Sequence, residues 1–179
     1  MISIEETASK GFIFFLSVDG TTCPIEEPRP WSKDNSAHKL GGKAGVDYEI
    51  GLSICESKMA WRRGPLPSGK QPDISNFRDE LKKQIPVGRR VIGDAGYGAD
   101  EDSDIISTQN ELDPKEIAYF KSRVLACHES FNCQIKQFKI MAHRFRHGLE
   151  NHQTAFDAVC AVVLYNMENG GKPLFDPYP

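Results

Sequence analysis

Apolar residues form two kinds of strand pattern in the first third of the chain. Residues 11–18 are almost continuously apolar and aromatic, which is typical of a strand buried on both faces. The Asp-Gly pair at 19–20 is expected to end this strand. Residues 46–55 alternate between apolar and polar side chains and predict a second strand, and residues 59–63 predict a third.

A helix and a short strand are predicted in the middle of the chain. Asp73 has the chemistry of a helix N-cap, and apolar residues follow it at helical spacing until the helix ends before Pro86. Residues 87–93, which end in Val-Ile-Gly, predict a short strand that leads into Asp94. The remaining segments are rich in proline, glycine or charge and are predicted as loops: 23–42, 64–73 and 95–113.

Helical patterns dominate the last third. Pro114 suits a helix start, and the helical pattern continues to about residue 147 with a break predicted near His128. A final helix at 152–168 is apolar on one face and ends at an Asn-Gly-Gly sequence. This order of elements predicts the α/β class, with a mixed sheet flanked by helices. If the first and fourth strands are adjacent and parallel, their C-terminal ends lie close together.

The length and composition fit one globular domain. A chain of 179 residues can bury a real core, and its 39% hydrophobic and 26% charged residues are ordinary for a soluble protein. No signal peptide is visible, and no apolar run approaches the roughly 18 residues that span a bilayer. The five cysteines are an odd number without close pairing. These features predict an intracellular protein, with no membrane partner and mostly free thiols.

Charge is unevenly distributed along the chain. The net charge is −3, yet residues 115–147 carry seven basic residues against two acidic ones. A basic segment within a mostly acidic chain indicates contact with a polyanion such as DNA, although a solvated helix face explains it as well. The candidate phosphate-binding residues of this segment are Arg123, Lys136, Lys139, Arg144 and Arg146.

Three acids stand in unlike settings. Asp19 and Asp94 each end a short apolar run before a glycine-containing turn, whereas Glu129 lies in the basic helical segment. Burial penalises a strand-end carboxylate, so such a position suggests function. Together the three could hold Mg²⁺ or Mn²⁺, and two such ions about 4 Å apart catalyse phosphodiester cleavage. Alternatively, the two aspartates are ordinary turn residues, and spacing alone leaves both interpretations open.

Two other metal motifs fit poorly. One is a zinc set with a spacing unlike the usual finger, and a single helix would spread it over roughly 30 Å. The other is a calcium-loop pattern in which isoleucine replaces the required glycine, so a solvated acidic loop is favoured. The zinc set is Cys127, Cys133, His143 and His147, and the calcium set is Asp100, Asp102, Asp104 and Glu111.

Five blocks occur in a characteristic order: SVDGTTCPI, PSGKQPDISNF, VIGDAGYG, HESFNCQIKQFKIMAHRFRHG and AVCAVVLYN. Over residues 11–166 they resemble a DDE-superfamily transposase endonuclease domain of the PIF/Harbinger-like branch. The resemblance implies an RNase H-like domain at 11–169, followed by a tail at 170–179. It implies that Asp19, Asp94 and Glu129 are catalytic ligands of two Mg²⁺ or Mn²⁺ ions, and that Lys136 positions a phosphate.

The implied activity is metal-dependent DNA cleavage at transposon ends, followed by strand transfer, in the nucleus. Two departures from the family pattern qualify it. Leu125 and Cys127 occupy positions that are often basic in relatives, and the usual N-terminal DNA-binding region is absent. We therefore expect a fragment or shortened descendant, with a separate DNA-binding protein supplying target recognition. The alternatives are a catalytically silent module that binds DNA or protein, and a stand-alone structure-selective nuclease.

Overall fold

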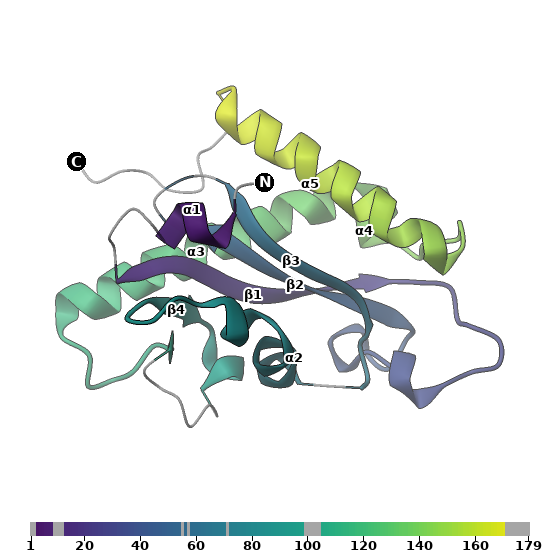
Figure 1. The fold of residues 1–179 in the computed structure, drawn as a ribbon. Helices are drawn as coiled ribbons and strands as arrows, with labels where there is room; N and C mark the ends of the chain where they lie inside the picture. The colour runs from purple at the N-terminus through teal and green to yellow at the C-terminus, as the bar shows by residue number, and fades with distance from the viewer. Residues whose placement is uncertain are drawn as a thin grey trace.

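A five-stranded mixed sheet forms the centre of the protein in the computed structural model, which describes residues 3–8, 13–54, 56, 58–70, 72–98 and 105–170 (Figure 1). The strands are β1 (Phe14–Pro24), β2 (Gly45–Ser53), β3 (Met59–Pro67), β4 (Arg90–Gly93) and β5 (Ile106–Ser107). The α-helices are α1 (Ile4–Ala8), α2 (Asp73–Asp79), α3 (Lys115–Gln137), α4 (Lys139–Ala142) and α5 (His152–Glu168). Short 3₁₀ helices are η1 (Lys33–Asn35), η2 (His38–Leu40), η3 (Leu81–Gln84), η4 (Ala95–Tyr97) and η5 (Leu149–Asn151).

The strand order is β3-β2-β1-β4-β5. The first three strands pair antiparallel, whereas β4 pairs parallel with β1 and β5 pairs parallel with β4. The predicted α/β class, with a mixed sheet flanked by helices, is confirmed. The condition for the C-terminal ends of the first and fourth strands to lie close together is met, because β1 and β4 are adjacent and parallel.

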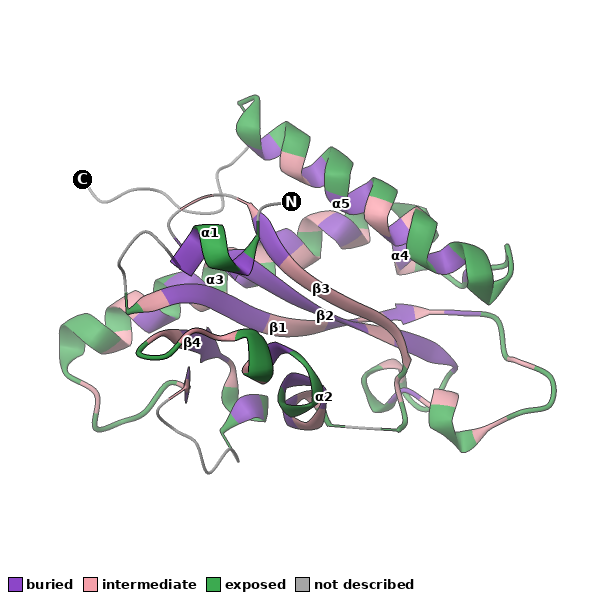
Figure 2. Ribbon diagram, viewed as in Figure 1, coloured by how far each residue is buried: buried purple, intermediate pink, exposed green. Residues whose placement is uncertain are grey.

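Helices cover both faces of the sheet (Figure 1). One face packs against α3, α4 and α5, through alternate β2 residues such as Tyr48 and Ile50 and helix residues such as Phe131 and Phe156. The other face packs against α1, α2 and η3, with Phe77 at its centre. Figure 2 shows the resulting pattern, with buried positions along the strands and on the helix faces turned toward them. The period-two pattern of β2 places alternate residues on one face, but β2 is buried on both faces, because every residue except Asp47 is buried.

Strand β1 is longer than its sequence predicts. The Asp19-Gly20 pair does not end it, because pairing with β2 continues from Gly20 opposite Glu49 to Pro24 opposite Gly45. Strand β4 is short, and its last pair with β1 is Gly93 with Val18. Beyond that pair, β1 has a neighbour on one side only. Asp19 is therefore the first residue of β1 past the end of β4.

The prediction of a helix break near His128 is wrong. Helix α3 is continuous through His128, whose buried ring lies 2.9 Å from the hydroxyl of Ser17 on β1. That contact gives Nδ1 of His128 a partner, whereas its Nε2 is buried without one. The break comes at Phe138, and an extended segment follows α4. Within the described part of the chain, no helix is long and apolar enough to cross a membrane.

Candidate functional site

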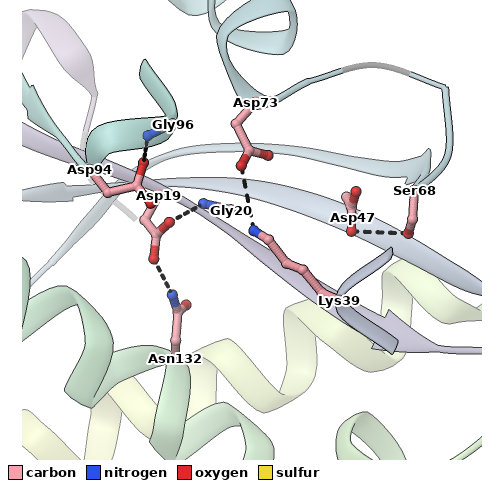
Figure 3. A network of polar contacts seen from close by, with 9 residues as sticks. All are labelled: Asp19, Gly20, Lys39, Asp47, Ser68, Asp73, Asp94, Gly96 and Asn132. Carbon is pink, nitrogen blue, oxygen red and sulfur yellow. Dashed lines mark hydrogen bonds and ion pairs between the residues drawn. The ribbon is translucent and has the colours of Figure 1, made fainter. Parts of the chain in front are cut away.

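Asp19 and Asp94 meet where β4 ends beside β1. Asp94 directly follows β4, and Asp19 is the first β1 residue beyond the last β1–β4 pair. Figure 3 shows the two side chains next to each other. They are close enough for the charge of Asp94 to raise the pKa of Asp19. The parallel pairing of β1 and β4 therefore brings the two aspartates together, as expected for adjacent parallel strands.

Local hydrogen bonds fix the orientation of both aspartates. Asp19 Oδ1 accepts from the backbone N–H of Gly20 at 2.7 Å, and its Oδ2 accepts from the amide of Asn132 on α3 at 2.8 Å. Asp94 caps η4, because its Oδ1 accepts from the N–H of Gly96 at 2.8 Å. Asp94 thus has the turn chemistry of the alternative interpretation, whereas Asp19 lies within β1. These bonds still leave carboxylate lone pairs for another ligand.

Asp19 is held in an environment that disfavours its charge. Burial raises its pKa from 3.8 to about 6, and the neighbouring carboxylates of Asp94 and Asp73 act in the same direction. The N–H of Gly20 and the ammonium of Lys39 oppose this increase without cancelling it. A carboxyl group with a raised pKa near a second acid is common at functional sites and gains from a bound cation.

Asp73 is a further acid at this site, and the sequence pattern assigned it only to a helix start. It is the first residue of α2, after Pro72 as N-cap. A Cβ on Gly20 would lie 2.8 Å from Asp73 Oδ1, and a Cβ on Gly96 would lie 3.0 Å from Asp94 Oδ1 and 3.7 Å from Asp73 Oδ2. The two glycines therefore give these carboxylates room to approach the backbone of β1 and η4. The sequence signal that could have identified Asp73 is its position directly after a loop that ends in Pro72.

Lys39 supplies the positive charge that these acids face. Its ammonium lies 3.5 Å from Asp73 Oδ2 (Figure 3). Burial lowers the pKa of Lys39, but Asp73, Asp19 and Asp47 outweigh that effect and the net result is a raised pKa. Asp47 accepts a 3.0 Å hydrogen bond from Ser68 and extends the network away from Asp19. The site is thus a row of carboxylates with one lysine at its centre.

Glu129 does not join this network. Its side chain is exposed and lines an open surface pocket with Ser130, Cys133 and Asn166 of α5. The α3 residue that contacts Asp19 is Asn132, three positions later. Among the residues whose placement is described, no group of three or more His, Cys, Asp or Glu side chains is arranged to hold a metal ion.

The donor set nevertheless fits one hard divalent cation in part. Asp19 and Asp94 offer carboxylate oxygens from two neighbouring strands, which Mg²⁺ and Mn²⁺ prefer over nitrogen or sulfur. The amide oxygen of Asn132 is buried beside Asp19 without a hydrogen-bond partner. Because Mg²⁺ retains several waters, two carboxylates are enough for a weak site. The three-acid arrangement expected from the resemblance is not assembled by these side-chain positions.

The basic residues of 115–147 are divided between two regions. Lys136 is half-buried and donates to the backbone carbonyl of Thr22, with its Nζ 3.3 Å from the sulfur of Cys23. Lys136 lies seven residues after Glu129 on α3, and its ammonium is bound to the end of β1. The other four candidates are all exposed: Arg123, Lys139, Arg144 and Arg146. The last two line a separate groove beside the loop that follows β1.

The remaining motifs add no second metal site in the described regions. The cysteines and histidines of the zinc pattern form no such group, and Cys133 is exposed. Three members of the calcium pattern, Asp100, Asp102 and Asp104, lie outside the described residues. Tyr97 packs in the core, with its ring 6.0 Å from the ring of Phe77.

Comparisons with protein-family models, with curated protein sequences and with solved structures find no match. The function is therefore inferred from the geometry of the site and from the sequence pattern.

Proposed function

We propose that this protein is a divalent-metal-dependent DNA endonuclease and strand transferase of the DDE transposase type, with an RNase H-like fold. The observation that carries the proposal is the pairing of Asp19 and Asp94 at the ends of two adjacent parallel strands. The mixed strand order and the helices on both faces support the fold assignment. DNA is the proposed substrate, and a separate DNA-binding protein is the proposed source of target recognition.

Asp19 and Asp94 would hold the ion, with Glu129 as the third ligand expected from the resemblance. When bound, a divalent ion activates a water or 3′-hydroxyl and stabilises the leaving oxygen. The chain's own contribution is to orient the two carboxylates. The N–H groups of Gly20 and Gly96 each fix one carboxylate oxygen. Partial burial of Asp19 lowers the local dielectric and so strengthens its attraction for a cation.

Asp94→Asn tests this proposal most directly, because it preserves the shape and the cap of η4 while removing the charge. We expect the variant to lose Mn²⁺-dependent nicking of supercoiled plasmid. Losing a ligand should also weaken Mn²⁺ binding at least as much as losing an outer-shell partner does, about 10–100-fold. Binding can be measured by isothermal titration calorimetry.

Asp34→Asn is the matched control, since Asp34 is an exposed aspartate in η1. It should leave both nicking and Mn²⁺ binding unchanged. Full nicking by the Asp94→Asn protein would remove the basis of the proposal.

A second candidate is a catalytically silent module that binds DNA or a protein. The observation that favours it is the position of Glu129 outside the carboxylate network, with Asn132 facing Asp19 instead. This candidate predicts DNA binding that persists in EDTA and in Asp94→Asn, together with no nicking by the wild-type protein. DNA binding that disappears under either treatment would count against it.

A further inference from the structure

A groove of about 820 Å³ lies between two segments that are far apart in the sequence. One wall is the loop after β1, which contributes Arg29 and Trp31. The other wall is the segment after α4, which contributes Arg144 and Arg146. None of the carboxylates around Asp19 lines this groove. It is therefore a separate feature of the protein.

Backbone hydrogen bonds hold the two walls together. Phe145 donates from its N–H to the carbonyl of Pro24 at 3.0 Å, and the N–H of Glu26 donates back to the carbonyl of Phe145 at 3.0 Å. The ring of Phe145 is buried and packs 4.6 Å from the ring of His152. The floor of the groove is thus tied both to β1 and to the start of α5. A site built in this way is formed before any ligand arrives.

Two arginines project from the same side of one wall. Arg144 and Arg146 flank Phe145 in extended backbone that pairs with Ile25. Side chains alternate in such backbone, so both arginines point away from the buried ring, roughly 6.6 Å apart at 3.3 Å per residue. Within the described part of the chain, neither these two nor Arg29 has an ion-pair or hydrogen-bond partner. Three guanidinium groups therefore face solvent at one groove.

Trp31 gives the groove an aromatic surface. Its side chain is 50% exposed, which is unusual for the largest apolar residue in a folded domain. An exposed indole beside unpaired arginines matches the way proteins bind single-stranded nucleic acid, in which bases stack on aromatics and phosphates pair with cations. Glu26 and Glu27 line the same wall. They can accept from the N–H groups of base edges. Because their carboxylates repel phosphates and acidic side chains alike, phosphates are expected on the opposite wall, at Arg144 and Arg146.

We propose that this groove binds a single-stranded nucleic-acid segment, with a base stacked on Trp31 and phosphates paired with Arg144 and Arg146. Duplex DNA fits less well, because its base faces are covered by stacking. Ile25 directly follows β1 and is six residues from Asp19, so the groove begins roughly 20 Å from the carboxylates. The choice of nucleic acid as the bound polymer rests on the proposed function, but the groove itself does not. It requires neither metal nor cleavage.

Fluorescence anisotropy with a labelled oligo(dT) of about 12 nucleotides, in EDTA, tests the proposal. Trp31→Ala should weaken binding by about 5- to 150-fold, which is the range that one lost stacking contact gives, whereas Trp31→Phe should retain most of the affinity. The double variant Arg144→Gln/Arg146→Gln should bind weakly. It should also lower the slope of log K against log salt by about 1.4, or 0.7 per lost phosphate contact.

The matched control is Lys83→Gln/Lys115→Gln, which removes the same charge from exposed positions on η3 and α3. The control should bind oligo(dT) like the wild-type protein. Equal losses in the control and in the arginine variant would overturn the proposal, as would a failure of the wild-type protein to bind oligo(dT). Tighter binding of the matching duplex, or of poly-glutamate, through the same arginines would also overturn it.

The two proposals fail separately. If the wild-type protein binds oligo(dT) but does not nick DNA, only the nuclease proposal is contradicted. Nicking that depends on Asp94 in a protein with no affinity for oligo(dT) would contradict only the groove. Asp94→Asn should leave oligo(dT) binding unchanged, because the groove does not include it.

Discussion

Glu49 carries a buried carboxylate in the middle of the sheet, and replacing it with glutamine tests how strongly burial controls stability here. Its side chain is 3% exposed, and Oε2 accepts a 3.0 Å hydrogen bond from the indole of Trp61. The other oxygen, Oε1, is buried without a partner. Burial raises the pKa of Glu49 from 4.5 to about 7, although the Trp61 bond and the charge of Arg63 oppose it.

The direction of the pH effect follows from this raised pKa. The folded protein binds the proton of Glu49 more tightly than the unfolded chain does, so stability falls as pH rises from about 4.5 to about 7. At about 1.4 kcal/mol per pKa unit, the cost of ionisation above pH 7 is about 3 kcal/mol. Glutamine cannot ionise and retains an acceptor for Trp61. Relative to wild type, Glu49→Gln should therefore gain about 3 kcal/mol of stability between about pH 4 and pH 8.

Urea denaturation followed by far-UV circular dichroism, in EDTA, measures this change. Circular dichroism is preferable to fluorescence because Trp61 contacts the titrating group. Glu111→Gln is the control, since Glu111 is an exposed glutamate in a loop. The reasoning is refuted if the stability difference between Glu49→Gln and wild type is the same at both pH values, or if the control shows an equal change.

Two further contacts give predictions about stability. Tyr48→Phe removes a buried 2.7 Å hydrogen bond to the ring of His152 and should lower the free energy of unfolding by about 1–3 kcal/mol in urea denaturation at neutral pH; an unchanged value would contradict this. Asp113→Asn removes the charged partner of the buried Lys121 ammonium, which also donates to the carbonyl of Thr108. The 2.9 Å hydrogen bond from Lys121 is the main cause of the lowered pKa of Asp113. The stabilisation is present above pH 3.8 and is lost as pH falls through the lowered pKa, so thermal melts should show a larger loss at pH 7 than at pH 3; an equal loss would contradict it.

The pattern of apolar and polar residues predicted the elements whose formation depends mainly on their own sequence. The period-two alternation of β2 places Tyr48 and Ile50 on the same buried face. The meeting of Asp19 and Asp94 was expected only if their strands were adjacent and parallel. The pairing of β1 with β4 meets that condition. The last helix was also predicted, because its apolar stripe is long and regular.

Tertiary contacts decided the rest. The Asp19-Gly20 pair has turn chemistry, but the continuous pairing with β2 carries β1 through it to Pro24. His128 interrupts an apolar pattern, yet its contact with Ser17 keeps α3 intact. Lys39 lies in a 3₁₀ helix within a predicted loop, and no periodicity could place it among the acids. Such features depend on partners distant in the sequence, which local propensity does not encode.

The choice between an enzyme and a silent binding module depends on which α3 residue faces Asp19. Glu129 precedes Asn132 by three residues, so the two side chains are about 60° apart around the helix and about 4.5 Å apart along it. Bringing Glu129 to the site would sacrifice the Asn132 bond, and a hydrogen bond to a charged group contributes roughly 1.5–3 kcal/mol. A ligand shifts such an equilibrium only by its differential affinity, so a divalent ion must bind the Glu129 arrangement better by more than this cost to make it the major one. In an enzyme, Mn²⁺ binding would therefore depend on Glu129 as well as Asp94. In a silent module, Glu129 would not affect it.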